Sequence, residues 1–95
     1  MDSVKLEKAR SNIDRINSRI VSLLIERMEQ VDQVAEYKAS HNLPVSVPER
    51  EKKIIANVSE LAGEEYADDI IPVFRAIFAA SCSRENRKMN RRSGL

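Results

Sequence analysis

The sequence predicts an all-α protein, and three observations support that prediction. The 95 residues include only two glycines and three prolines, so few positions break a helix. Ala, Leu, Ile, Glu, Lys and Arg, which favour helices, are common. Apolar side chains recur at helical spacing over long stretches, the first from about Leu6 to Asn42. We therefore expect a chain of three helices.

The first helix is predicted over about residues 4–41. At 1.5 Å per residue it would span roughly 55 Å, whereas a compact chain of this length is only about 32 Å across. A helix that is longer than its own domain can be accommodated when two copies pack along each other, so we expect an intertwined homodimer. Its apolar stripe contains Ile13, Ile16, Ile20, Leu23, Leu24, Val31, Val34 and Ala35.

The second helix is predicted over about residues 47–62. Ser46 and Glu49 have the spacing of a capping box, in which each side chain satisfies a backbone N–H at the start of the helix. Pro48 suits the first turn, where its missing N–H costs little. Gly63 is a favourable residue at which to end the helix.

The third helix is predicted over about residues 67–89. Asp68 or Asp69 is the expected cap, and Pro72 is expected in the first turn. The predicted inner face continues from apolar into polar side chains, and it contains Ile70, Ile71, Phe74, Ile77, Phe78, Ser81 and Glu85.

Charged side chains lie on or beside these apolar stripes. Arg27 and Lys38 are eleven residues apart on the first helix, so at about 100° per residue they point within roughly 20° of each other. Arg50 and Glu51 take similar positions on the second helix. Because an unpaired buried charge is costly, these side chains need partners or a ligand. We predict a pocket for an anionic small molecule; for any one of them, a side chain that snorkels at the edge of the core is the alternative.

The composition narrows the classes of function. The formal net charge is +1, which gives no strong bias toward nucleic acid or a membrane. The single cysteine, Cys82, excludes an intrachain disulfide and a cysteine-based metal cluster. No run is long or apolar enough for a signal peptide or a membrane span, so we expect one cytoplasmic domain over residues 1–95. Basic residues recur from Arg84 onward without interleaved aromatics, so residues 88–95 are predicted to be a frayed, solvated tail.

The combined spacing of these residues resembles the all-helical chorismate mutase family, of the intertwined-dimer type found in bacteria. The resemblance covers about residues 5–88, and its specificity lies in the whole set. The residues that carry it are Arg10, Ile13-Asp14, Leu23-Leu24, Glu26-Arg27, Lys38, Pro44-Val45, Glu49-Arg50-Glu51 and the segment from Phe74 to Glu85.

The resemblance implies that four basic residues bind the substrate, chorismate. Arg10 would reach across the dimer to a substrate carboxylate, and Arg27 would hold the carboxylate of the enolpyruvyl group. Lys38 would contact a carboxylate and the ether oxygen. Arg50 would support the carboxylate end.

The resemblance also implies that polar residues surround the substrate ring. Glu51 would accept a hydrogen bond from the ring hydroxyl, Ser81 would assist at the ring carboxylate, and Glu85 would face the ether oxygen opposite Lys38. Two positions depart from the family pattern. Val47 stands where many relatives have Asp, and Glu85 stands where the bacterial enzymes usually have Gln.

The implied reaction, chorismate to prephenate, is a sigmatropic rearrangement that requires no nucleophile, metal or cofactor. Arg27 would fix the folded substrate, and Lys38 would stabilise negative charge that develops on the ether oxygen. Glu85 could donate to the same oxygen only when protonated, so higher activity at acidic pH is expected. No nucleic acid, membrane or metal is implied.

Two other functions stay open at this point. Isochorismate-pyruvate lyases share the fold and look similar through Lys38-Ala39-Ser40 and Pro48-Glu49-Arg50. Glu51 suits the hydroxyl of chorismate and favours the mutase, whereas the apolar Val47 is as in the lyases. A non-catalytic helical dimerisation module would explain the long helix but would leave the interior cations without partners.

Overall fold

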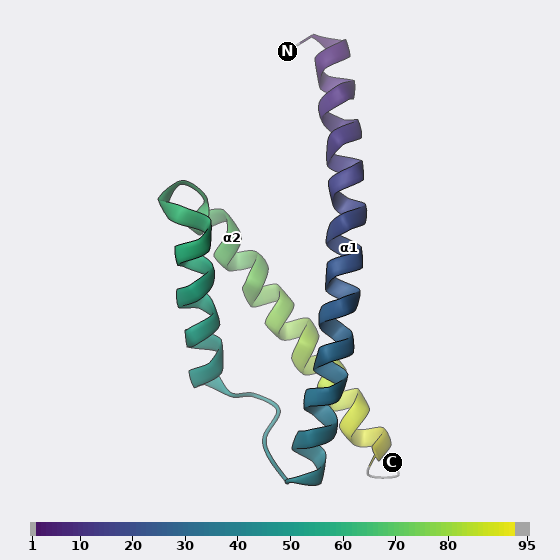
Figure 1. Cartoon of the computed structure of the whole chain (residues 1–95), viewed down its shortest axis with the longest axis vertical. Coiled ribbons are helices and arrows are strands. Elements are labelled where there is room, and N and C mark those ends of the chain that lie inside the picture. The colour runs from purple at the N-terminus through teal and green to yellow at the C-terminus, as the bar shows by residue number, and fades with distance from the viewer. Residues whose placement is uncertain (1, 93–95) are drawn as a thin grey trace. The chain divides into compact units, whose positions relative to one another are not determined.

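The computed structural model describes the backbone of residues 2–92 and the side chains of residues 2–90, all of which belong to helices and their connections. Helix α1 comprises Ser3–Ser40, helix α2 comprises Pro48–Arg92, and residues 41–47 connect them (Figure 1). No strand occurs within the described residues. The all-α prediction is confirmed.

The prediction of three helices is corrected to two. Apart from Gly63, the chain is helical from Pro48 to Arg92, so Asp68, Asp69 and Pro72 lie inside α2 and do not begin a separate helix. The predicted helix end at Gly63 coincides with a kink inside α2, where this residue has φ 77° and ψ 168°. That backbone conformation is essentially restricted to glycine, and it lets α2 fold back without a linker. We call residues 48–62 the first arm and residues 64–92 the second arm.

Helix α1 ends within one residue of its predicted boundary. Asn42 adopts a left-handed conformation with φ 53°. The backbone N–H of Leu43 donates to the carbonyl of Lys38 at 2.9 Å, and that of His41 donates to the carbonyl of Tyr37 at 3.1 Å. This pattern, in which a left-handed residue lets the chain satisfy carbonyls of the last turn, is typical of helix C-termini. It places Lys38 in the final turn of α1, next to the connection.

The chain divides into two compact units, Met1–Gln30 and Val31–Leu95. The second unit contains the last turns of α1, the connection and both arms of α2. Within it, the second arm returns to lie beside the end of α1 (Figure 1). The predicted basic tail is helical as far as Arg92, and residues 93–95 of that prediction lie outside the described residues.

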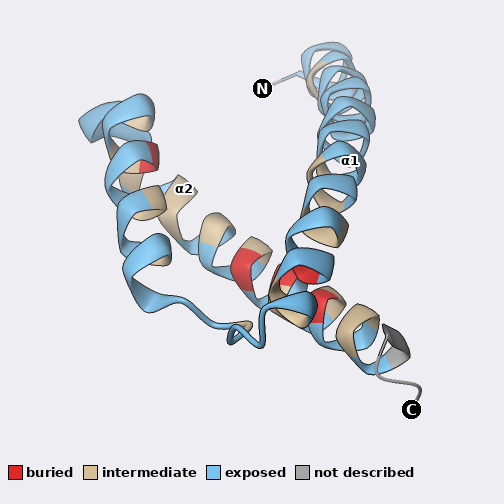
Figure 2. Cartoon of the chain, turned by 60° about the horizontal axis from the view of Figure 1, so that its bottom comes forward, coloured by how far each residue is buried: buried red, intermediate tan, exposed pale blue. Residues whose placement is uncertain are grey.

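All the buried residues in the described part of the chain belong to the second unit (Figure 2). Phe78 packs edge-on against Phe74, with ring centroids 6.4 Å apart, which is a favourable aromatic arrangement. Two polar residues are buried as deeply as the apolar ones. The full buried set is Ala35, Val58, Phe78, Ser81 and Glu85.

The described part of the unit Met1–Gln30, which is helical from Ser3 onward, has many exposed apolar side chains. Their exposed fractions range from 37% to 76%, so the single chain leaves substantial apolar area in contact with water. These residues are Val4, Leu6, Ile13, Ile16, Ile20, Val21, Leu23 and Ile25. Within the described residues, neither helix combines the length and the apolar content that crossing a membrane requires.

Candidate active site

A buried ion pair joins the last turn of α1 to the second arm of α2. The ammonium of Lys38 donates to Oε1 of Glu85 at 2.8 Å and to the carbonyl of Val45 at 2.8 Å. The side chains of Lys38 and Glu85 are only 14% and 8% exposed. Because an ammonium carries three donors, these two bonds leave Lys38 the capacity to bind one further acceptor.

Ser81 lies one helical turn before Glu85, and both face inward. The residues are each 6% exposed, and the Ser81 hydroxyl donates to the carbonyl of Ile77 at 2.8 Å. Side chains four residues apart share a helix face, which explains why the apolar stripe of the second arm continues into these polar groups. The sequence prediction that Ser81 and Glu85 lie on an inner face is therefore matched by their burial.

The thiol of Cys82 is partly buried and lies close enough to Glu51 for the charge of that side chain to act on it. Burial raises the pKa of Cys82, the negative charges of Glu85 and Glu51 raise it further, and the positive charge of Lys38 opposes them. Glu51 comes from the first arm of α2, so both arms contribute charge here. The second unit therefore contains the Lys38–Glu85 pair and the buried Ser81, and the charge of Glu51 acts on the neighbouring Cys82 thiol.

Arg50 is exposed and lies in the first turn of α2. Its backbone N–H donates to the carbonyl of Val47 at 3.0 Å. Within residues 2–90, no side-chain hydrogen bond or ion pair joins Arg50 to Lys38 or Glu85. The structure therefore brings Arg50 next to Glu51 along the chain without linking it to the buried pair.

Arg10 and Arg27 belong to the other compact unit, Met1–Gln30. Arg10 is exposed and lies 3.8 Å from the carboxylate of Glu7, one helical turn earlier. Arg27 is partly buried. Their participation in a site around Lys38 stays a prediction.

Sequence reasoning missed two features around the buried pair. The first is the carbonyl of Val45, which fixes Lys38 from the connection. The second is a contact between Asp32 on α1 and Arg84 on α2, whose side chains form two hydrogen bonds of 2.6 and 2.7 Å. The basic character of the segment from Arg84 onward suggested only a solvated surface, and no local signal connects residues so far apart in sequence.

A hollow lies between the two arms of α2. It has a volume of about 500 Å³, and Glu51 is one of the residues that line it. Ile55 and Ile71 contribute apolar walls, and Arg75 contributes a positive charge. Within the described residues, no group of three or more His, Cys, Asp and Glu side chains is arranged to hold a metal ion.

The chemistry of the buried group suits an oxygen-rich organic ligand. A desolvated ammonium interacts with an acceptor or an anion much more strongly than it would in water, and the hydroxyl and the carboxyl groups can orient polar substituents. The arrangement can therefore bind an oxygen that gains negative charge during a reaction.

Comparisons with known proteins agree with this chemistry. The sequence model described as chorismate mutase type II matches residues 9–86. The chain is 36% identical over 69 residues to a chorismate mutase of Methanocaldococcus jannaschii, with 73% of the chain and 70% of that protein covered. No solved structure matches the chain.

The chain also matches part of two longer relatives. The chain is 34% identical to the bifunctional chorismate mutase/prephenate dehydratase of Aquifex aeolicus, with 87% of the chain but 24% of that protein covered. It is also 34% identical to the T-protein of Enterobacter agglomerans, with 88% and 23% covered. The chain thus spans about a quarter of the length of these two relatives.

Proposed function

The chain belongs to the chorismate mutase type II family, and we propose that it catalyses the rearrangement of chorismate to prephenate. The observation that carries the proposal is the desolvated ammonium of Lys38, which Glu85 and the Val45 carbonyl hold in place within the matched region. A fixed cation of this kind is what a reaction with developing negative charge on oxygen requires.

In the proposed mechanism, Lys38 donates to the ether oxygen of the substrate as the C–O bond breaks. Negative charge accumulates on that oxygen only in the transition state, so the interaction strengthens along the reaction coordinate and lowers the barrier. The ammonium is already oriented by two bonds, and little reorganisation is needed when the charge develops. No covalent intermediate and no cofactor take part in this scheme.

The remaining residues bind and fold the substrate. Glu51 accepts a hydrogen bond from the ring hydroxyl, and Ser81 assists at the ring carboxylate. Arg27 grips the enolpyruvyl carboxylate in a bidentate manner, while Arg10 and Arg50 support the carboxylate end. Together these contacts hold the enolpyruvyl arm over the ring, which is the conformation that reacts.

We further propose that the active protein is a homodimer in which Arg10 is contributed across the interface. The exposed apolar side chains of the unit Met1–Gln30 support this proposal, because burying them against a second copy is favourable by about 25 cal/mol per Å². Arg10 is exposed within the same segment, so it would be available to a partner's site.

The test is the loss of chorismate absorbance with purified protein at pH 5 and pH 7.5. Arg27→Ala is expected to abolish turnover, and Arg15→Ala, an exposed arginine of the same helix, is the matched control that should keep it. Release of pyruvate from isochorismate without turnover of chorismate would assign the lyase activity instead. A protein that converts neither substrate would contradict the proposal and leave a helical dimerisation module.

A further inference from the structure

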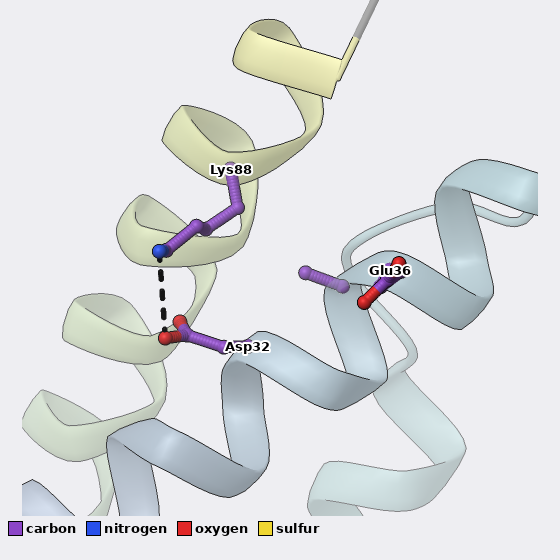
Figure 3. A pocket seen from close by; sticks show the side chains of 4 residues that line it. Asp32, Glu36 and Lys88 are labelled. Atoms are coloured by element: carbon purple, nitrogen blue, oxygen red, sulfur yellow. Dashed lines mark ion pairs between the residues drawn. The ribbon is translucent and has the colours of Figure 1, made fainter.

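The guanidinium of Arg84 forms a bidentate contact with the carboxylate of Asp32. Nε donates to Oδ1 at 2.6 Å and Nη2 donates to Oδ2 at 2.7 Å. The ammonium of Lys88, one turn further along α2, lies 3.5 Å from Oδ2 of Asp32 (Figure 3). Bidentate pairs of this kind fix orientation as well as distance.

This contact lies close to the proposed catalytic pair on both helices. Arg84 directly precedes Glu85 on α2, and Asp32 lies six residues, or about 9 Å, before Lys38 on α1. Ala35 lies between the two contacts and is 0% exposed, so the helices approach closely where its small side chain allows it. The same two helices are therefore joined at two separated points.

Two separated contacts restrict the rotation of α2 more than the Lys38–Glu85 contact alone would. The Lys38 side chain is long and flexible, so its bond to Glu85 alone would tolerate rotation of α2 about its axis. The planar fork of Arg84 on a short aspartate tolerates little rotation. Holding the residue next to Glu85 in a fixed orientation therefore also fixes where the Glu85 carboxyl meets the Lys38 ammonium.

We propose that Asp32 and Arg84 are positioning residues for the reaction, which act by setting the geometry of the Lys38–Glu85 pair. The proposal rests on the proposed function. Displacements of about 1 Å in a catalytic group can lower a rate about 10²-fold. Since Arg10, Arg27 and Arg50 also bind the substrate carboxylates in the proposed mechanism, the loss of positioning should reduce kcat much more than it raises KM.

The kinetic test compares variants that remove the fork with a control from the same helix. Asp32→Asn and Arg84→Gln should each lower kcat by about 10-fold to 10²-fold, because small displacements of a catalytic group have effects of this size. KM should change less than about threefold. The double variant Asp32→Arg with Arg84→Asp restores opposite charges and should recover part of kcat. Arg87→Gln is the control, because Arg87 is exposed and donates to Ser83, on its own helix, at 2.9 Å.

A second readout does not depend on turnover. In protein labelled with ¹⁵N-lysine, the Lys38 ammonium should give a protected ¹H–¹⁵N signal because two acceptors hold it. The signal should broaden in Asp32→Asn and persist in Arg87→Gln. Loss of the signal in Asp32→Asn, with a wild-type protein that does not convert chorismate, would support positioning while rejecting the proposed function. Asp32→Asn that stays folded with unchanged kcat and an unchanged signal would overturn the inference.

Discussion

At the scale of single residues, Glu85 has two possible relations to Lys38. In the structure it accepts a hydrogen bond from the Lys38 ammonium and so helps to orient it, while a third N–H of the ammonium stays available for a substrate oxygen. A protonated Glu85 would itself donate to that oxygen, so the two forms of one carboxyl group would assist the proposed reaction in different ways.

We therefore predict that Glu85→Gln changes the pH profile of kcat/KM, because an amide donates a hydrogen bond at every pH whereas a carboxyl group donates only when it is protonated. The measurement is chorismate consumption across the pH range, with Glu49→Gln as the control, since Glu49 lies on the surface and pairs with the exposed Lys52 at 3.5 Å. An unchanged slope in Glu85→Gln would remove Glu85 from this role.

The same pair sets a stability prediction. Lys38→Met leaves the Glu85 carboxylate buried without its cation, which typically costs about 3–5 kcal/mol. The double variant Lys38→Met with Glu85→Leu removes both charges and should recover most of that loss without recovering activity. Urea denaturation measures the free energies of unfolding. If the single and the double variant lost the same free energy of unfolding, the buried Glu85 carboxylate would not depend on Lys38 for its stabilisation.

At the scale of elements, Gly63 decides that α2 folds back on itself. Its conformation, φ 77° and ψ 168°, is unfavourable for any residue with a side chain. A Cβ at this position would meet no atom within 4 Å. Replacing Gly63 should therefore lower the free energy of unfolding because the backbone conformation is strained, and not because the new side chain clashes with a neighbour.

Gly63→Ala is expected to lower the free energy of unfolding by about 1–3 kcal/mol. Glu64→Ala, in the next residue of the helix, is the control and should change stability little, since exposed helical positions tolerate Ala. Thermal or urea unfolding checks both variants. A Gly63→Ala protein as stable as the wild type would show that the kink can be made without a positive φ.

The contact between Asp32 and Arg84 gives this interhelical junction a defined response to acid. The Arg84 hydrogen bond lowers the pKa of Asp32, burial opposes this effect, and the positive charges of Arg84 and Lys88 add to the lowering. Asp32 lines a small cavity together with Ala35 and Lys88, and Glu36 is the other acidic side chain that lines it. With a folded pKa below the ordinary value near 3.8, the unfolded state binds more protons between the two values, so the contribution to stability is present above that range and lost as the pH falls through it.

The stability difference between the wild type and Asp32→Asn should consequently shrink as the pH falls. We expect a clear difference in urea midpoint at pH 6 and a smaller one once the pH falls below the lowered pKa that Asp32 has in the folded state. Asp14→Asn, on the exposed part of α1, is the control. A difference that is constant with pH would mean that the ionised carboxylate is not what stabilises the junction.

At the scale of the whole molecule, the exposed apolar side chains of the unit Met1–Gln30 require an explanation. An isolated soluble chain rarely leaves so many large apolar groups in water. The proposed homodimer would bury them, and it would also bring the exposed Arg10 to a second copy.

The prediction is a dimer in sedimentation equilibrium that dissociates when two of these positions are charged. Ile16→Glu with Ile20→Glu should yield monomers and abolish turnover, because each buried isoleucine contributes about 1.5–3 kcal/mol. Arg15→Glu is the control, as this residue lies on the polar face of the helix and should leave the dimer intact. A wild-type protein that sediments as a monomer and still converts chorismate would reject the dimer.

The sequence by itself determined the helical class, the bounds of α1 to within one residue, and the inward orientation of Ser81 and Glu85. Each of these depends on residues that are close in sequence: the helical spacing of apolar groups, the Asn42 end of α1 and the one-turn spacing of the polar pair. The family resemblance, which the match over residues 9–86 confirms, drew on the same spacing. The roles of the site residues stay predictions, and these residues are Arg10, Arg27, Lys38, Arg50, Glu51, Ser81 and Glu85.

Only the tertiary structure decided how α2 turns and which charges meet. Gly63 is compatible both with a helix end and with a sharp reversal, and packing of the second arm beside α1 selects the reversal. Lys38 and Glu85 are 47 residues apart, and Asp32 and Arg84 are 52 apart. Local patterns carry no information about such pairs, because the partner of a buried charge is set by the path of the chain in space.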